Sequence, residues 1–148
     1  MIRRGAALAS IPLLVGLTVC RAPLVDAAQS GEMSTASNGL YNIEQATRGK
    51  DEYSTYCAAC HGEKLTGSPA APLLASAEFI RAWSGRSVYD LLTFIGTEMP
   101  FDSPGSLAHK TYRDIAAFLL HANQFPAGNR ELPEGEPELK QILIGEAR

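Results

Sequence analysis

Hydrophobic residues recur every third or fourth position from Asn42 to Tyr56, which is the spacing of one face of an α-helix. Asn42 and Gln45 have the separation of a capping box, in which two side chains satisfy free N–H groups of the first turn. Gly49 lies on the apolar face, although glycine within a helix costs about 1 kcal/mol relative to alanine. We therefore predict a helix that starts after Asn42 and that another backbone approaches closely at Gly49.

Two further segments have helical periodicity. One starts with a second capping pair, Ser87 and Asp90, and is predicted to end at Gly96. Its apolar residues, at i, i+3, i+4 and i+7, are Val88, Leu91, Leu92 and Ile95. The other is predicted to start at a cap on Ser106 and to continue to about Asn123.

A shorter helix is predicted after Ser76, with Phe79 and Trp83 on its inner side. Glycine and proline interrupt residues 61–75 and 100–105, which we expect to form loops. No segment alternates apolar and polar residues convincingly, so no strand is expected. The pattern predicts an all-α domain of about four helices, with a core so thin that another group could help to fill its centre.

Residues 126–148 form a predicted C-terminal extension, where three prolines exclude a long helix until the last residues. Its apolar residues gather near the end: Leu139, Ile142, Leu143 and Ile144. Two interpretations of this apolar cluster remain open. It docks onto a partner protein, or it packs back onto the domain.

The N-terminal segment has the three parts of a secretory signal peptide. Basic residues at positions 3 and 4 precede an uncharged stretch, Gly5 to Cys20, and small residues near Ala27 suit cleavage. We predict a signal peptide over 1–27 and a flexible leader over 28–41, rich in Ser, Gly, Thr and Asn. An uncleaved membrane anchor is the alternative, although 16 apolar residues are short for a bilayer span. Lipid attachment at Cys20 is disfavoured by the bulky Val19 before it.

Length and charge restrict the possible functions. The chain has 148 residues, which suits one domain, and 13 basic against 16 acidic side chains. An acidic chain is poorly suited to nucleic acid, because binding to phosphates needs clustered Lys and Arg. Cleavage after residue 27 would leave a net charge of −5 and remove one of the three cysteines.

The two remaining cysteines belong to the sequence Cys57-Ala58-Ala59-Cys60-His61. This C-x-x-C-H motif is the attachment signature of c-type haem. Two thiols three residues apart can reach the two vinyl groups of one porphyrin, and the next residue, a histidine, can present its imidazole to the iron. Export agrees with this chemistry, because covalent attachment prevents loss of the cofactor outside the cytoplasm.

Other chemistries use the same cysteine spacing. A redox-active dithiol of the thioredoxin type needs a βαβ setting, and no strands are expected here. A zinc site would need a second pair of ligands, and the predicted mature chain has no other cysteine. A structural disulfide between Cys57 and Cys60 is the simplest alternative.

A haem iron bound by His61 needs a sixth ligand or an open position. The candidate side chains are Met33, Met99, His109 and His121. Met99 is favoured because it follows a predicted helix in a loop, at a chain distance from His61 that allows approach from the other face of the ring. A thioether favours Fe(II) and raises the reduction potential. The alternative role of Met99 is to fill a gap in the core.

Residues 42–125 resemble a class I cytochrome c. The resemblance rests on four stretches: Cys57 to Gly62, Ala71-Pro72-Leu73, Met99-Pro100 and Tyr112 to Leu119. It implies an all-α cytochrome c fold of about four helices wrapped around one covalently bound haem. It also implies that Gly49 and Tyr53 meet the last helix at Ile115, Phe118 or Leu119.

The same resemblance implies roles around the haem. The carbonyl of Pro72 would accept the Nδ1 proton of His61, and Leu73 would pack on the ring. Trp83, Arg81 and Arg86 are weaker candidates for contacts with the propionates.

We therefore expect a periplasmic one-electron carrier with one haem c, attached through Cys57 and Cys60 and ligated by His61 and Met99, rather than an enzyme. Its partners would be redox proteins, with no nucleic acid, and a membrane only if the signal segment is retained. Residues 79–91 and 123–128 resemble small cytochromes that accompany quinoprotein dehydrogenases. Such a dehydrogenase would be the donor, and a terminal oxidase or another cytochrome the acceptor.

Two other functions stay open. The chain could be the electron-accepting subunit of a larger dehydrogenase. It could also be a ligand-binding haem protein or a peroxidase with a vacant sixth position.

Overall fold

The computed structural model describes residues 39–145, so the predicted signal peptide and residues 28–38 of the predicted leader lie outside the described part. The described residues form six helices: α1 (Ile43–Tyr56), α2 (Ala58–His61), α3 (Ala77–Trp83), α4 (Val88–Glu98), α5 (His109–Ala122) and α6 (Glu136–Gln141). Between residues 39 and 145 there is no extended strand, only two isolated bridges. The predicted all-α class is confirmed. Within the same residues, no helix is long and apolar enough to cross a bilayer.

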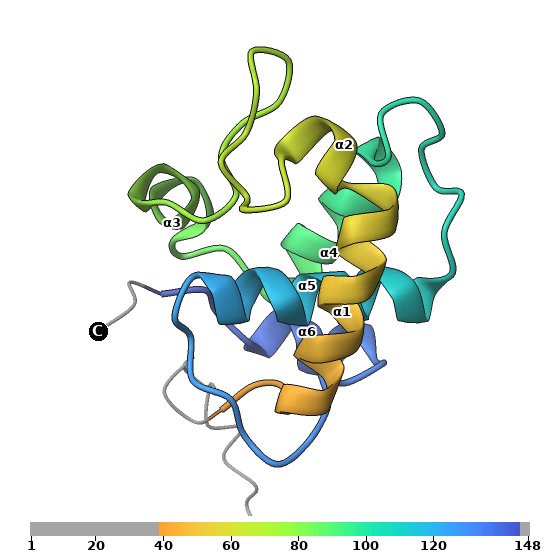
Figure 1. Cartoon of the computed structure of the whole chain (residues 1–148). Helices are drawn as coiled ribbons and strands as arrows, with labels where there is room; N and C mark the ends of the chain where they lie inside the picture. Colours follow the sequence, from red (N-terminus) through yellow and green to blue (C-terminus); the bar gives the residue numbers. More distant parts are fainter. Residues whose placement is uncertain (1–38, 146–148) are drawn as a thin grey trace, which may run out of the picture. The chain divides into compact units, whose positions relative to one another are not determined.

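Helices α1 and α5 cross at the centre of the fold (Figure 1). Gly49 makes the crossing possible, because a Cβ atom there would lie 1.8 Å from the carbonyl oxygen of Asp114. The backbones therefore touch at this point, as the interior glycine predicted. Beside the crossing, the rings of Tyr53 and Phe118 pack with centroids 5.3 Å apart.

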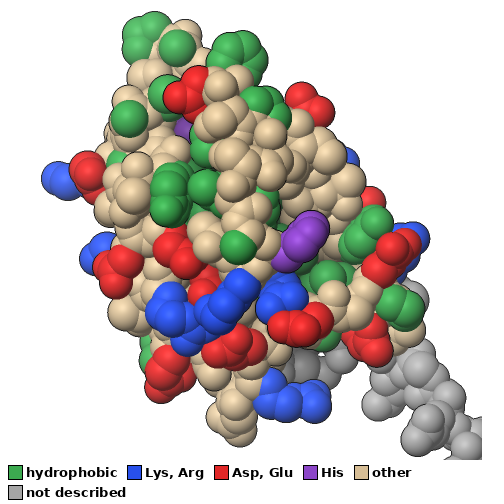
Figure 2. All heavy atoms as spheres, turned by 90° about the vertical axis from the view of Figure 1, so that its right-hand side faces the viewer, with side chains coloured by type: hydrophobic (Ala, Val, Ile, Leu, Met, Phe, Trp, Pro, Cys, Tyr) green, Lys and Arg blue, Asp and Glu red, His purple; other side chains and the backbone are tan. Residues whose placement is uncertain are grey.

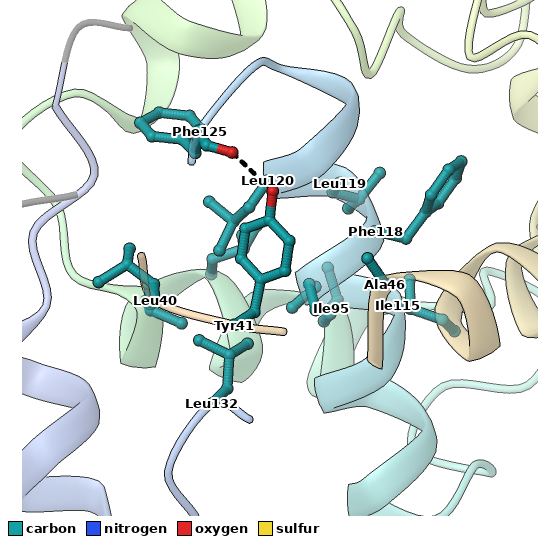
Figure 3. Packing of buried hydrophobic residues seen from close by; sticks show 14 of the residues in the cluster. Leu40, Tyr41, Ala46, Ile95, Ile115, Phe118, Leu119, Leu120, Phe125 and Leu132 are labelled. Carbon is teal, nitrogen blue, oxygen red and sulfur yellow. Dashed lines mark hydrogen bonds between the residues drawn. The ribbon is translucent and has the colours of Figure 1, made fainter. Parts of the chain in front are cut away.

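The start of the described chain is part of the core (Figure 3). Leu40 and Tyr41, at the end of the predicted leader, are both buried. The hydroxyl of Tyr41 donates to the carbonyl oxygen of Phe125 at 2.6 Å. The backbone of Gly128 donates to the carbonyl of Tyr41, and the backbones of Gly39 and Gly128 are in close contact. The segment before α1 is thus held against the segment after α5, so the prediction of a flexible leader is wrong for residues 39–41.

Three helix starts agree with the sequence. Asn42 and Ser76 each accept a hydrogen bond from the third residue beyond, and Ser87 forms a complete capping box with Asp90. The predicted end of α4 is wrong, because Gly96 keeps a helical backbone and Met99 still donates to the carbonyl of Ile95. Glycine ends a helix only where it turns into the left-handed region.

The predicted start of α5 is also wrong. Ser106 belongs to the preceding turn, where its N–H bonds to the carbonyl of Ser103, and the helix begins at His109. The N–H of Leu107 is satisfied by the hydroxyl of Tyr112 at 3.4 Å. Ala108 is the N-cap of α5 and makes no side-chain hydrogen bond to the first turn.

The C-terminal extension packs back onto the domain. Leu132, Leu139, Ile142 and Ile144 are all buried, and α6 packs against α4. Of the two interpretations of the apolar cluster, packing back onto the domain is confirmed for Leu139, Ile142 and Ile144, and Leu143 stays partly exposed. The extension supplies apolar side chains that a four-helix core lacks.

A buried carboxylate ties α1, α5 and the extension together. Asp114 is fully buried and accepts hydrogen bonds from Gln45, Arg48 and Lys110. Gln45 in turn accepts from the N–H of Leu132 at 2.8 Å. Burial alone would raise the pKa of Asp114, but these donors hold its pKa below the ordinary value. Acidic and basic side chains also lie next to one another on the surface shown in Figure 2.

Replacement of Gly49 by alanine tests the crossing. We expect G49A to lower the free energy of unfolding by at least about 2 kcal/mol, because overpacking exceeds the gain in helix propensity. Urea denaturation measures this change. The matched control is G96A in α4, where a Cβ atom would meet nothing within 4 Å. It should stabilise the protein by about 0.5–1 kcal/mol. Equal effects of the two variants would contradict the proposed close approach.

Low pH should weaken the hydrogen bonds that the Asp114 carboxylate accepts. Because the folded-state pKa is lowered, its contribution is present at neutral pH and is lost as the pH falls below about 4. We expect D114N to cost about 3 kcal/mol at neutral pH, and the difference from wild type to narrow in acid. Urea denaturation from about pH 3 to pH 7 measures both effects. The control D51N, at an exposed position of α1, should stay within about 0.5 kcal/mol of wild type.

Candidate functional site

A cavity of about 550 Å³ lies between the helices and the two long loops. Its lining is predominantly apolar and comes from α1 to α5 and the loops that follow α2 and α4. Five of the six residues singled out from the sequence line it: Cys57, Cys60, His61, Pro72 and Met99. Candidate haem-binding side chains up to 42 residues apart in the sequence thus line one cavity.

One tight turn presents the C-x-x-C-H motif. Helix α1 ends at Tyr56, and α2 follows with Cys57 as its N-cap. The N–H of His61 donates to the carbonyl of Cys57 at 3.0 Å. Gly62 then leaves the helix with a positive φ of 77°, which suits glycine. This turn places both thiols and the imidazole along the same cavity wall.

The imidazole of His61 is held in one orientation. It is buried, with only 8% of its surface exposed, and its Nδ1 lies 3.0 Å from the carbonyl oxygen of Pro72. The carbonyl can only accept, so Nδ1 carries the proton and Nε2 keeps its lone pair for a metal. This is the hydrogen bond that the resemblance implied, and such a bond increases the basicity of a metal-bound imidazole.

The structure corrects the position assigned to Leu73. Its side chain is half exposed and is not among the residues that line the cavity, whereas the next residue, Leu74, lines it. Backbone bonds fix this register, since Leu74 donates to Leu65 and its carbonyl accepts from Asn123. These bonds turn Leu74 toward the cavity and leave Leu73 at the surface.

Met99 reaches the same cavity from the end of α4. Its carbonyl oxygen accepts a hydrogen bond from the hydroxyl of Tyr112 at 2.7 Å. Tyr112 is buried on α5 and lines the cavity too. Sequence reasoning placed Tyr112 only in the closing helix and missed its role beside Met99. A hydroxyl on an otherwise apolar face was the available signal, because a buried tyrosine hydroxyl needs a partner.

The other methionine and histidine candidates lie elsewhere. Met33 is outside the described residues, and neither His109 nor His121 lines the cavity. The Nδ1 of His121 lies 3.2 Å from the hydroxyl of Tyr41. Among the candidate sixth ligands in the described residues, Met99 alone therefore shares the cavity with His61.

The candidates for propionate contacts lie at different positions. Trp83 is buried and lines the cavity. The guanidinium of Arg86 lies 4.2 Å from the centroid of the Trp83 ring. Arg81 pairs with Glu78 at the surface.

Few charged side chains line the cavity. Asp102 is the one acidic lining residue, and no lysine or arginine lines the cavity. Burial raises the pKa of the Cys57 thiol to about 11, and the neighbouring Cys60 adds to this shift. A redox-active dithiol needs a lowered thiol pKa, so the site does not suit thioredoxin-type chemistry.

The residues fit a haem group. The cavity offers an apolar interior for the macrocycle, two thiols for its vinyl groups, and one nitrogen and one sulfur ligand for the iron. Tyr53, which lines the same cavity, donates its hydroxyl proton to the carbonyl of Gly62 at 2.7 Å and so supports the turn after the motif.

Residues 44–119, just over half of the chain, match the family described as cytochrome c oxidase, cbb3-type, subunit III. The chain belongs to that family. It is a class I monohaem cytochrome c and a haem-based electron carrier, and its cofactor is a covalently bound haem c. Cys57 and Cys60 of this cytochrome have the spacing of the attachment motif.

The chain is also similar to one chain in the crystal structure of the sulfane dehydrogenase SoxCD from Paracoccus pantotrophus. The sequence identity is 20%, the match covers 89% of this cytochrome and 70% of the other chain, and the TM-score is 0.48. No curated relative matches the sequence.

The support of Met99 by Tyr112 can be tested in the haem-loaded protein through its stability. We expect Y112F to lower the free energy of unfolding by about 1–2 kcal/mol, because the Met99 carbonyl and the Leu107 N–H lose their partner. Urea denaturation measures the loss. The control Y56F removes the hydroxyl from a half-exposed ring that also lines the cavity, and should change stability by less than about 0.5 kcal/mol. Equal losses in both variants would argue against the support.

Proposed function

We propose that this cytochrome is a periplasmic one-electron carrier in which Cys57 and Cys60 hold the haem and His61 and Met99 are the axial ligands. One observation carries the proposal: these four side chains, from two distant segments, line a single apolar cavity. The bound haem supplies one-electron transfer between ferric and ferrous iron. The remaining tasks belong to the polypeptide.

The polypeptide orients both proposed ligands through their surroundings. The Pro72 carbonyl keeps the Nδ1 proton on His61 and leaves Nε2 available to the iron. The end of α4 and the hydroxyl of Tyr112 hold the backbone of Met99. Two ligands held in this way keep one geometry in both oxidation states, so little rearrangement accompanies each electron.

The same arrangement favours a carrier over an enzyme. With His61 and Met99 both bound, the iron would have no open position for a substrate. The apolar side chains around the cavity, such as Phe79, Leu91 and Ile95, exclude water from it. A neutral thioether and a dry site both favour the ferrous state and thus a higher reduction potential.

Localisation and partners rest on the sequence. The basic start, the uncharged stretch and the small residues near Ala27 support export, with residues 28–38 as a leader, 39–125 as the haem domain and 126–148 as its extension. The net charge of −5 after cleavage favours a partner with a basic docking surface, because such steering increases the association rate. We propose a periplasmic dehydrogenase, of the quinoprotein type, as donor and a terminal oxidase or another cytochrome as acceptor.

An optical spectrum of the purified protein tests the proposed ligation. We expect a reduced c-type spectrum and, in the oxidised state, an iron–thioether charge-transfer band that M99A abolishes. The matched control M33A removes the other candidate methionine and should retain the band.

Two results would contradict the proposal. Purified protein that contains no haem would favour the alternative interpretation, in which Cys57 and Cys60 form a structural disulfide. Haem that lacks the thioether band and takes up carbon monoxide readily would exclude Met99 and indicate a ligand-binding haem protein.

A further inference from the structure

The C-terminal extension holds the turn between α3 and α4. The N–H of Gly85 donates to the carbonyl of Ile144 at 2.8 Å, and the N–H of Ile144 donates back to the carbonyl of Arg86 at 2.8 Å. The N–H of Val88 donates to the carbonyl of Ile142 at 2.9 Å. These three bonds fix the backbone on both sides of Arg86.

Apolar burial holds the same segment in place. Ile144 is fully buried, and Ile142 is 6% exposed. On the other side of the contact, Val88 at the start of α4 is also fully buried. The segment is therefore part of the core, and its register against the turn is determined by side chains as well as by hydrogen bonds.

This turn also positions the Arg86 side chain against the cavity wall. The Arg86 guanidinium lies 4.2 Å from the Trp83 ring centroid, within the range of a cation–π interaction. The ring of Trp83 also packs edge-on against Phe94, with centroids 5.6 Å apart. Both aromatic rings line the cavity, so a continuous series of contacts leads from Ile144 through Arg86 to the site.

The charge of Arg86 matters because the cavity lining has no lysine or arginine of its own. Oxidised iron carries one more positive charge than reduced iron. A cation held near the site therefore disfavours the oxidised form. Arg86 is exposed, so its effect on the potential depends on the contact that keeps the guanidinium against the Trp83 ring.

We infer that residues 142–144 are a positioning element of the haem site, which holds Arg86 against Trp83 and thereby raises the reduction potential. This inference rests on the proposed electron-carrier function, since a potential is relevant only to a redox centre. The contacts from Ile144 to Trp83 do not depend on that function.

A pair of substitutions at Ile144 separates the hydrogen bond from the buried side chain. I144P removes the N–H that donates to Arg86, and I144A removes most of the side chain but keeps the N–H. The fluorescence of Trp83, the one tryptophan of the chain, and the midpoint potential of the haem-loaded protein are the two measurements. We expect I144P to increase the fluorescence and lower the potential, and I144A to do so much less.

The cation is tested separately, in a variant that keeps the buried core intact. R86Q should lower the midpoint potential, as I144P does. The double variant R86Q/I144P should have a midpoint potential no lower than that of the single variant with the larger shift. The control R130Q removes a charge from an exposed loop position and should have a smaller effect on the potential.

The outcomes distinguish this inference from the proposed function. Variants of Ile144 that lose stability but keep the wild-type fluorescence and potential would overturn the positioning role. The same holds if R86Q and R130Q shift the potential equally. If Met99 proves not to be a ligand, the proposed function fails, but the response of Trp83 to I144P still tests the contacts from Ile144 to Trp83.

Discussion

The contact between the backbones of α1 and α5 at Gly49 determines the rest of the molecule. Because a side chain is missing there, the two longest helices approach until the backbone of one meets the carbonyl of Asp114 on the other. Helix α1 delivers the C-x-x-C-H motif at its C-terminal end, and α5 delivers Tyr112. The distance between the two halves of the site thus depends on a position where no larger residue fits.

Polar groups at the same crossing make its geometry specific. The carboxylate of Asp114 accepts hydrogen bonds from side chains of α1 and of its own helix. Gln45 also accepts a hydrogen bond from the C-terminal extension. A buried carboxylate with fewer donors would be costly, so sliding either helix along the other is opposed. The site itself has the opposite character, with an apolar lining in which few polar atoms compete with the proposed ligands.

Local chemistry accounts for what the sequence could predict. The caps at Asn42, Ser76 and Ser87 lie within four residues of their partners, and the motif at Cys57 to His61 is a single turn. Turns and long-range contacts account for the errors. Ser106 is held in the turn with Ser103, and the inward position of Leu74 depends on its bond to Leu65 and on a bond from Asn123. The burial of Ile142 and Ile144 depends on a turn more than fifty residues earlier. No periodicity along the chain reports such partners.

The close contact between Gly39 and Gly128 has a mechanical consequence. Tyr41 is clamped through its hydroxyl to Phe125 and through its carbonyl to Gly128. A tag or fusion partner joined before Gly39 would therefore start from a rigid attachment point beside the end of α5, without a swivel inside the folded domain. Tension applied at that point would meet the two Tyr41 hydrogen bonds before it reached α1 and the cavity wall that follows it.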